Sequence, residues 1–166
     1  MMITIRSAHA DDLAFILSLT PRFHDFELPA WLTAAQLDQV NQRTLSANIS
    51  APAPGAAMLI AQDAAGVALG FIHLQTETDY FSGQPQGYIS DIAVAAEAEG
   101  RGVGQALMQA AETWTRAQGY RLLALHVFAQ NARARRFYAR LGFSETVISC
   151  VKTLDPPAPD APTGGA

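Results

Sequence analysis

Three alternate glycines, Gly100, Gly102 and Gly104, stand in the stretch EGRGVGQALM, directly before a segment with helical apolar spacing. Glycine lets a ligand approach main-chain N–H groups closely. The first N–H groups of a helix have no partner within the helix, and the helix dipole adds partial positive charge there. The stretch therefore predicts an anion site, most simply for a phosphate, at the start of a helix.

Two common phosphate-binding motifs do not fit this stretch. A Walker loop needs a lysine after its last glycine, and the stretch has none. A dinucleotide motif needs a third glycine where this chain has Gln105 or Leu107, and an acidic residue about 20 positions further on, near Arg121. A nicotinamide-dependent oxidoreductase is thus disfavoured, and a pyrophosphate cradle of the coenzyme A type remains.

A second segment that could carry chemistry is NARARRFYARLGF, residues 131–143. Asn131 is suited to cap a helix and Gly142 to end it. The apolar face of this helix consists of Ala134, Phe137, Tyr138 and Leu141. From the residues alone, Tyr138 is a core tyrosine whose hydroxyl finds a hydrogen-bond partner.

The elements that must position these segments alternate between strands and helices. Alternating or apolar runs predict strands at 2–6, 58–62, 67–74, 88–94, 121–128 and 147–154. The run 121–128 is apolar enough to be buried on both faces. Caps and periodicity predict helices at 11–20, 33–50, from the glycine stretch to 119, and 131–142. Residues 76–87 are expected to form a loop, and the order predicts a mixed α/β fold with helices on both faces of one sheet.

Length and composition indicate one globular domain over residues 1–154. The chain has 166 residues, of which 49% are hydrophobic, and a net charge of −4, which disfavours nucleic acid as a partner. The single cysteine, Cys150, cannot pair within the chain, and the four histidines lack metal-site spacing. Because we find no leader and no membrane-length apolar run, we expect a cytoplasmic protein without a metal or a membrane partner. Residues 155–166 are expected to form a disordered tail rich in proline, glycine and alanine.

Taken together, the two segments resemble the GNAT superfamily of acyl-CoA-dependent N-acyltransferases. The first family motif is a strand ending in valine, a short loop, and R/Q-x-x-G-x-G/A at a helix start; it matches Val94, Gly102 and Gly104. The second is an asparagine followed by alanine and tyrosine at helical spacing and a Gly-Phe pair; it matches Asn131, Ala134, Tyr138 and Gly142-Phe143. The resemblance covers roughly residues 3–154, and the presence of both motifs in this order is a specific sign of the family.

The resemblance implies a GNAT fold, in which a central, mostly antiparallel sheet splays two strands apart so that acyl-CoA lies in the gap. It implies acetyl-CoA as the acyl donor, an oxyanion-stabilising N–H near Val94, and Tyr138 as the general acid for the leaving thiolate. The candidate cofactor-binding residues are Ala93, Val94, Glu99, Gly100, Arg101, Gly102, Val103, Gly104, Gln105, Ala106, Asn131, Ala134, Phe137 and Tyr138.

Glu99 departs from the family pattern, which has arginine or glutamine at this position. An acid beside a pyrophosphate is unfavourable unless its side chain points into solvent, and Arg101 could supply compensating charge. Because main-chain N–H groups do most of the binding in this motif, we expect Glu99 to change affinity rather than the reaction.

Asp91 is the candidate general base. It shares a strand face with Ile89 and Ala93 and is expected to be partly desolvated, which suits a carboxylate to accept a proton from the attacking amine. A purely structural carboxylate fits the residues equally well. The lesser candidates are His73, Glu77 and His126.

Two further groups of residues stay open at this level. One side of the last predicted helix carries three arginines, Arg133, Arg136 and Arg140. The simplest interpretation is a basic face exposed to solvent, and the alternative is that one of them contacts a phosphate of the cofactor. The loop 79–81 could line the acceptor pocket or simply connect two strands.

The function predicted from the resemblance is transfer of an acetyl group from acetyl-CoA to a primary amine on a small molecule or peptide. The alternative is a non-catalytic acyl-CoA-binding sensor, which would keep the glycine cradle but would not need Tyr138 or Asp91. The amine stays unidentified, and a homodimer is left open.

Overall fold

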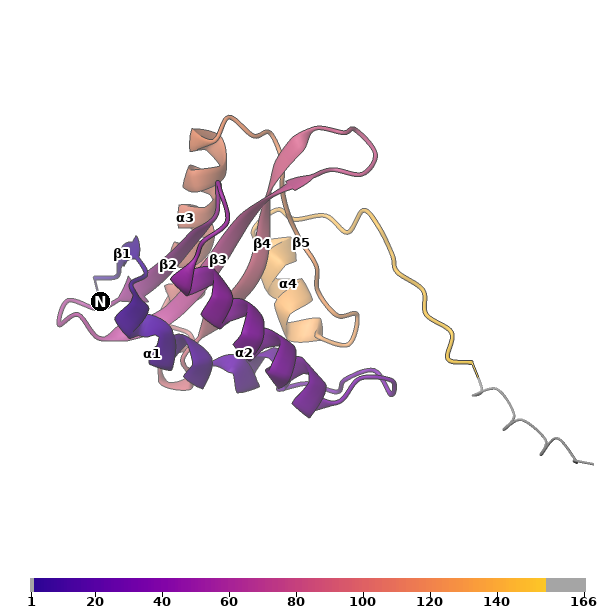
Figure 1. Ribbon diagram of the computed structural model, residues 1–166, viewed down its shortest axis with the longest axis horizontal. Coiled ribbons are helices and arrows are strands. Elements are labelled where there is room, and N and C mark those ends of the chain that lie inside the picture. Colours follow the sequence, from indigo (N-terminus) through magenta and orange to yellow (C-terminus); the bar gives the residue numbers. More distant parts are fainter. Residues whose placement is uncertain (1, 155–166) are drawn as a thin grey trace, which may run out of the picture.

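The computed structural model describes residues 2–154, which form one five-stranded sheet covered by helices (Figure 1). The strands are β1 (Thr4–Ser7), β2 (Ala57–Gln62), β3 (Ala68–Thr78), β4 (Pro85–Val94) and β5 (Leu123–Leu125). The α-helices are α1 (Leu13–Ser18), α2 (Ala34–Ser50), α3 (Val103–Ala117) and α4 (Ala132–Arg140). Three short 3-10 helices are η1 (Ala10–Asp12), η2 (Thr20–His24) and η3 (Ala96–Ala98). Helices α1 and α2 cover one face of the sheet and α3 covers the other, as predicted (Figure 1).

The sheet is mixed and mostly antiparallel, in the order β1-β2-β3-β4-β5. Strands β1 to β4 pair antiparallel with their neighbours, and β5 joins β4 in parallel over three residues, Gly87–Ile89 against Leu123–Leu125. Beyond Ile89, β4 continues to Val94 without β5, so the two strands part. The predicted splayed strand pair is confirmed.

The core lies on both faces of β3. Its Phe71, Ile72 and Leu74 are fully buried. Helix α3 supplies one apolar face at the spacing expected of a helix that covers a sheet; its buried residues are Val103, Leu107, Met108, Ala111 and Thr115. This packing fixes the start of α3 beside the end of β4, where the glycine stretch lies.

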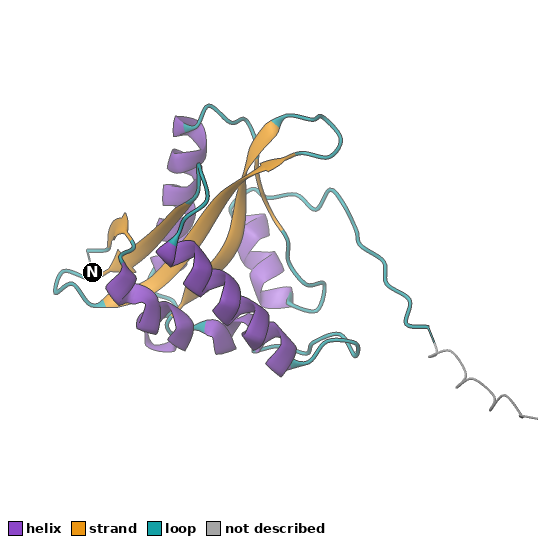
Figure 2. Ribbon diagram, in the orientation of Figure 1, coloured by secondary structure: helices purple, strands orange, loops and turns teal. Residues whose placement is uncertain are grey.

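The predicted loop over 76–87 is mostly strand. Figure 2 shows β3 and β4 extending as a long hairpin arm, in which Glu77 lies opposite Gln86 and only 79–84 connect the strands. The prediction was wrong because it relied on polar composition. Main-chain ladder bonds hold the arm together, and its polar residues are exposed or half-buried.

Three other predicted elements also differ. The strand over 121–128 is limited to Leu123–Leu125 and is half-buried, because β5 is an edge strand that parts from β4. The helix over 11–20 is divided among η1, α1 and η2, with Pro21 in the first turn of η2, where its missing N–H is tolerated. Residues 147–154 form no strand and are exposed. The predicted tail, 155–166, lies outside the described residues.

Candidate active site

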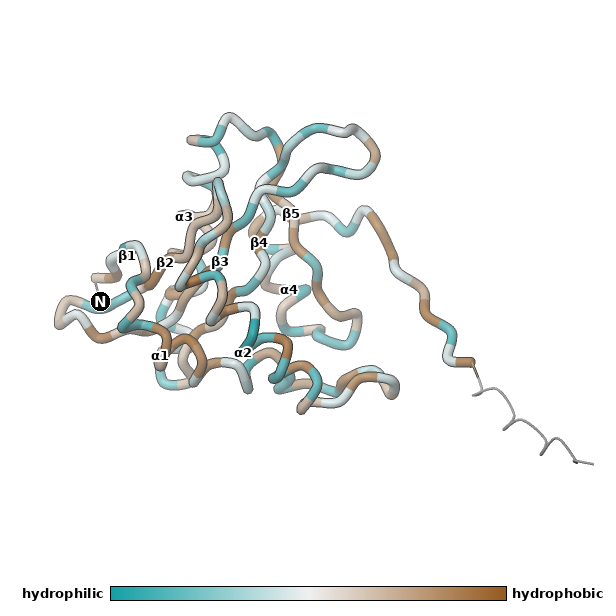
Figure 3. Tube along the Cα trace, viewed as in Figure 1, coloured by the Kyte–Doolittle hydropathy of each residue, from teal (hydrophilic) through white to brown (hydrophobic). Residues whose placement is uncertain are grey.

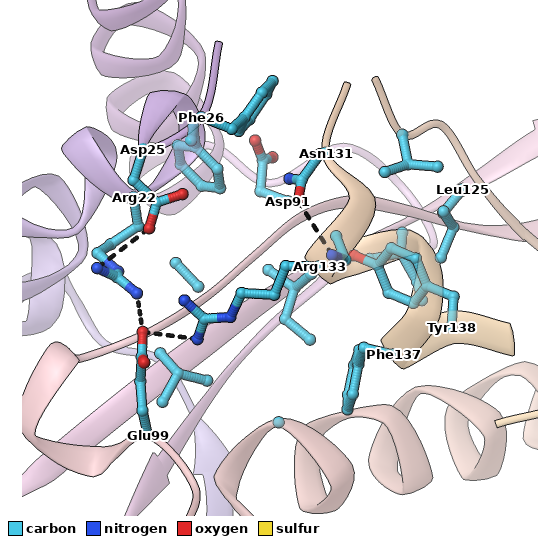
Figure 4. Close-up of a pocket in the computed structure, with 18 of the residues that line it drawn as sticks. Arg22, Asp25, Phe26, Asp91, Glu99, Leu125, Asn131, Arg133, Phe137 and Tyr138 are labelled. Carbon is cyan, nitrogen blue, oxygen red and sulfur yellow. Dashed lines mark hydrogen bonds and ion pairs between the residues drawn. The ribbon is translucent and has the colours of Figure 1, made fainter. Parts of the chain in front are cut away.

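A cavity of about 680 Å³ opens where β4 and β5 part. One wall is the end of β4, the opposite wall is residues 125–128, and the start of α3 and the inner side of α4 close one end. Residues of η2 and α2 also line it, and Figure 4 shows Arg22 of η2 directed toward Glu99. The cavity thus joins both sequence motifs in one space.

The start of α3 offers main-chain donors to this cavity. Gly102 caps the helix with a φ of +83°, a conformation that other residues rarely adopt. The first helical bond runs from the N–H of Ala106 to the Gly102 carbonyl at 3.0 Å, so the N–H groups of Val103, Gly104 and Gln105 precede the helical ladder. A Cβ at Gly100 or Gly102 would meet nothing within 4 Å, which leaves space for a ligand.

Gly104 is needed for a different reason. A Cβ at this position would lie 3.2 Å from Cζ of Phe137 on α4, closer than side chains normally pack. The third glycine therefore allows α3 and α4 to approach each other, and it makes room for a protein ring rather than for a ligand.

Glu99 lies at the centre of a charge cluster. Its carboxylate forms ion pairs with Arg22 of η2 and with Arg133 of α4, the latter at 2.8 Å, and Arg22 also pairs with Asp25 at 3.1 Å (Figure 4). Arg22 and Arg133 thus supply compensating charge to this acid, and Arg101 does not line the cavity. Two guanidinium groups remove the unfavourable field that an isolated acid would impose on a bound phosphate.

Helix α4 begins at the cap that its sequence predicts. The Asn131 side chain caps it by accepting the N–H of Ala134 at 3.0 Å. Tyr138 lies between the rings of Phe137 and Phe143, with centroids at 5.5 and 5.9 Å, and lines the cavity. Burial raises the pKa of Tyr138 to about 12. The phenol consequently keeps its proton throughout the physiological pH range.

Asp91 is paired with a buried histidine. Strand β4 bulges at Ser90, since Ile89 lies opposite Leu74 but Asp91 lies opposite His73. The Asp91 carboxylate is 3.1 Å from Nδ1 of His73, and their side chains are 12% and 2% exposed. Asp91 faces the cavity and His73 lies behind it. The carboxylate is therefore fixed in place with its second oxygen left for another partner.

A further imidazole on the opposite wall contacts a phenol. His126 lines the cavity, and its Nδ1 is 2.8 Å from the hydroxyl of Tyr88. Desolvation, followed by the charges of Glu77 and Asp91, raises the pKa of Tyr88. Glu77 itself does not line the cavity, and the loop 79–81 lies at the tip of the hairpin arm, where it connects two strands.

Most of the candidate cofactor-binding residues line the cavity, and so does Asp91. The exceptions are Arg101 and Ala106. The three arginines whose role was open, Arg133, Arg136 and Arg140, also line it. Positive side chains and main-chain donors at one end of the cavity fit a ligand that carries phosphate groups.

The sequence interpretation missed the wall formed by the N-terminal third of the chain. The cavity residues there include Arg22, Asp25, Phe26, Leu37 and Asn41. Phe26 meets Phe128 across the cavity with ring centroids 5.6 Å apart. The stretch FHDFELP offered a signal only in its mixture of aromatic and acidic residues, because no local spacing links it to the glycine stretch.

Residues 2–154 contain no cluster of three or more histidine, cysteine or acidic side chains placed to hold a metal. Over the same residues, no helix has both the length and the apolar character needed to cross a membrane.

Sequence comparisons point to acetyltransferases. A sequence model described as the Acetyltransferase (GNAT) family matches residues 17–143. An aminoglycoside N(6')-acetyltransferase type 1 from Stenotrophomonas maltophilia is 34% identical over 107 residues, which make up 61% of this chain and 70% of that protein. A mycothiol acetyltransferase from Propionibacterium freudenreichii subsp. shermanii is 37% identical over 89 residues, or 54% of this chain and 28% of that much longer protein.

Solved structures share the fold. A GCN5-related N-acetyltransferase from Ralstonia eutropha JMP134 superposes with a TM-score of 0.72 at 22% identity, covering 92% of this chain and 99% of the other. The aminoglycoside acetyltransferase AAC(6')-Iy, solved with a CoA-containing bisubstrate analog, has a TM-score of 0.69 at 22% identity, covering 94% and 100%. With the family model spanning most of the chain and the splayed strands on which both motifs meet, the chain belongs to the GNAT family of acetyltransferases.

Proposed function

We propose that this protein transfers an acetyl group from acetyl-CoA to a primary amine on a small molecule, by direct attack of the amine on the thioester. The observation that carries the proposal is the single cavity that joins the free N–H groups of α3 to Tyr138 and Asp91. One end suits a phosphate-bearing donor, and the rest holds one group able to give a proton and one able to take it.

The donor end would hold acetyl-CoA through main-chain N–H groups from Val103 to Gln105, with arginines of α4 close to its phosphates. Bound acetyl-CoA supplies the thioester carbonyl, which an amine can attack. The open space at Gly100 and Gly102 lets the backbone come within hydrogen-bonding reach of such a ligand.

The acceptor end would remove a proton from the incoming ammonium. Asp91 is the base in this scheme, because its carboxylate faces the cavity while His73 fixes it from behind. The neutral amine then forms the C–N bond, and a main-chain N–H near Val94 stabilises the oxyanion of the tetrahedral intermediate.

Tyr138 would complete the transfer. As the C–S bond breaks, the phenol gives its proton to the leaving thiolate. Burial raises the pKa of Tyr138 to about 12, so the group is protonated at the start of every cycle. The nitrogen of the collapsing intermediate gives up its second proton, which restores the Tyr138 phenol directly or through water, and Asp91 releases its proton to solvent. Acetylated amine and free thiol then leave.

The walls favour a small cationic amine as acceptor. Asp91 lies on the acceptor side, and the rings of Phe26 and Phe128 offer an apolar surface to the same cavity. Two relatives act on small molecules by name, one on aminoglycosides and one on mycothiol, which supports this class.

Calorimetric titration with acetyl-CoA, coenzyme A and NADH tests the donor, and thiol release with a panel of small amines tests the reaction. We expect acetyl-CoA to bind, NADH to give no signal, and at least one amine to release thiol in proportion to acetylated product. Failure of both coenzyme A species to bind contradicts the proposal. Binding without turnover on any amine would instead favour the acyl-CoA sensor.

A further inference from the structure

One imidazole on the cavity wall has no part in the proposed reaction. His126 directly follows β5, is exposed to solvent and lines the cavity. Its Nδ1 is 2.8 Å from the hydroxyl of Tyr88, and Tyr88 does not line the cavity. Among residues 2–154, Nε2 of His126 has no hydrogen-bond partner. The ring is therefore held at one nitrogen by the protein and leaves the other nitrogen for a ligand.

A bulge in β4 places Tyr88 on the same face of the sheet as Asp91. Tyr88 lies opposite Gln75 of β3. Asp91 lies opposite His73, two residues earlier on the same strand. Residues directly opposite each other share a face, and so do residues two apart in one strand. Without the extra residue at Ser90, side chains three positions apart would point to opposite faces. The bulge thus brings together the proposed base and the phenol that holds the imidazole.

The two walls of the cavity meet at a fork, where β4 and β5 part after Ile89 and Leu125. Figure 3 shows that β3 and β4 are hydrophobic in the middle of the sheet and mostly hydrophilic toward the hairpin arm. Asp91 and His126 lie just beyond the last paired residues, one on each side of the fork, and both line the cavity. Neighbouring strands are about 4.8 Å apart before they part. One small ligand can therefore reach both side chains.

The hydroxyl of Tyr88 determines which nitrogen of His126 carries a proton. Desolvation, followed by the charges of Glu77 and Asp91, raises the pKa of Tyr88, so the phenol keeps its proton at neutral pH. Because no other group within residues 2–154 accepts this proton, the phenol donates it to Nδ1. A neutral imidazole that accepts at Nδ1 has its own proton on Nε2, and a charged imidazole has one there as well. In either state, the nitrogen offered to the cavity is an N–H donor.

We propose that His126 is a specificity-determining residue, which selects amines that carry a hydroxyl or carbonyl oxygen a few bonds from the nitrogen. An N–H donor cannot pair with an ammonium group, but it can bind such an oxygen while the amine is held at Asp91. Tyr88 is a positioning residue, because it fixes the ring and its tautomer. An amine without the oxygen leaves the donor without a partner, which costs affinity. The inference rests on the proposed function, since it assumes that an amine is acetylated in this cavity.

Matched amines test this selection by thiol release. trans-2-Aminocyclohexanol and cyclohexylamine form one pair, and glycinamide and isobutylamine form another; only the first member of each pair has the oxygen. In His126→Phe, the KM of the oxygen-bearing amine should rise about 5- to 10-fold, the value of one lost hydrogen bond. The kcat, the KM of the oxygen-free amine and the Kd of acetyl-CoA should not change. His126→Gln keeps an N–H donor of similar reach and should restore most of the affinity.

The outcomes separate this inference from the proposed function. Turnover of the oxygen-free amines alone overturns the selection and leaves the proposed function standing. The same is true if KM changes equally for both members of a pair in His126→Phe. No turnover of any amine overturns both.

Tyr88→Phe tests the positioning role. The variant frees the imidazole to change tautomer, so the KM of the oxygen-bearing amine should rise by a smaller factor than in His126→Phe. Tyr80→Phe is the matched control: Tyr80 is 91% exposed at the tip of the hairpin arm, and its variant should behave as the unmodified protein. A KM in Tyr88→Phe equal to that of the control would show that the phenol does not position the ring.

Nitrogen-15 NMR of the imidazole reports the tautomer without any turnover. The His126 signals are assigned by their absence in His126→Phe. At pH 8 they should be those of an imidazole protonated at Nε2, and in Tyr88→Phe they should move toward the average of the two tautomers. An imidazole protonated at Nδ1 in the unmodified protein overturns the proposal, because the cavity would then face a nitrogen that accepts.

Discussion

Two of the carboxylates that line the cavity, Glu99 and Asp91, are held in different ways. Glu99, beside the start of α3, is bound by the two permanently charged guanidinium groups of Arg22 and Arg133. Asp91, on β4, is bound by one imidazole, that of His73, which is almost fully buried. Glu99 thus has its charge balanced in place by two fixed positive charges, both in contact with its Oε1, whereas Asp91 is paired with an imidazole alone.

This difference assigns Glu99 to binding of the acyl donor and Asp91 to the reaction itself. A carboxylate fixed by two arginines is a poor proton acceptor, and its effect on a ligand is that of a fixed charge. A carboxylate held by a single imidazole can take a proton from a substrate while it stays in position. The comparison therefore predicts that changes at Asp91 affect turnover and changes at Glu99 affect donor affinity.

The largest effect is expected from Asp91→Asn. Asparagine keeps the shape but cannot accept a proton, so kcat at neutral pH should fall by about 10²- to 10⁴-fold, with the Kd of acetyl-CoA unchanged. The loss should shrink as pH rises toward the pKa of the amine, because more of the acceptor is then already neutral. Thiol-release kinetics across pH measures both effects.

Asp79→Asn is the matched control, since Asp79 lies at the tip of the hairpin arm and hydrogen-bonds Ser82 there. This variant should turn over at the rate of the unmodified enzyme. Equal loss of kcat at all pH values in Asp91→Asn would make Asp91 a structural carboxylate.

Tyr138→Phe should lower kcat by about 10²-fold and leave donor binding intact, because the thiolate then has to take its proton from solvent. Single-turnover measurements with saturating acetyl-CoA report this step. Tyr120→Phe is the control: Tyr120 pairs with Thr76 and lies outside the cavity. Unchanged kcat in Tyr138→Phe would remove this residue from the mechanism.

The raised pKa of Tyr138 also makes stability depend on pH. The buried phenol holds its proton more tightly in the folded chain than in the unfolded one, so its contribution is complete below the ordinary value of about 10. This contribution is lost as pH rises from about 10 to 12, where the unfolded chain ionises first. The free energy of unfolding should fall more steeply over this range in the unmodified protein than in Tyr138→Phe. Parallel slopes in denaturant titrations would contradict the assignment.

The sequence predicted the parts of the cavity that come from one contiguous segment better than the parts that depend on how distant segments pack. The N–H groups of α3 and the cap at Asn131 come from contiguous segments whose glycines and periodicity can be read directly. The pairing of His73 with Asp91 depends on the register of two strands and a bulge at Ser90, which no local pattern shows. The position of Arg22 against Glu99 depends on how η2 packs, 77 residues away along the chain.

The fold shows the same division. Helices α3 and α4 were predicted close to their observed bounds, since caps and apolar faces are local. Strand 147–154 was predicted from its apolar residues, but a strand also needs an edge to pair with, and the local sequence does not say which edge. The extent of β5 was overestimated for the same reason, because its apolar run continues past the point where β4 departs.

A smaller effect is expected from Gly102→Ala at the donor end. Alanine at a φ of +83° is strained by about 1–2 kcal/mol and should tilt the N–H groups that follow, so acetyl-CoA should bind about 10-fold more weakly with a smaller change in kcat. Gly66→Ala is a matched control: Gly66 has a φ of +82° and equally open surroundings, but lies in the turn after β2. Equal loss of affinity in both variants would mean that general destabilisation, not the cradle, is responsible.

The smallest effect is expected from Glu99→Gln, which tests the binding side of the comparison. Arg22 and Arg133 balance Glu99 and Asp25 one for one, so the variant leaves one net positive charge beside the cradle. The Kd of coenzyme A should fall by about 5-fold, or about 1 kcal/mol, and the gain should shrink with added salt because the cluster is partly exposed. Weaker binding of coenzyme A by Glu99→Gln would contradict this prediction. Glu99 would then be the group that holds Arg133 in position to contact a phosphate, so that the acid would favour binding in spite of its own negative charge.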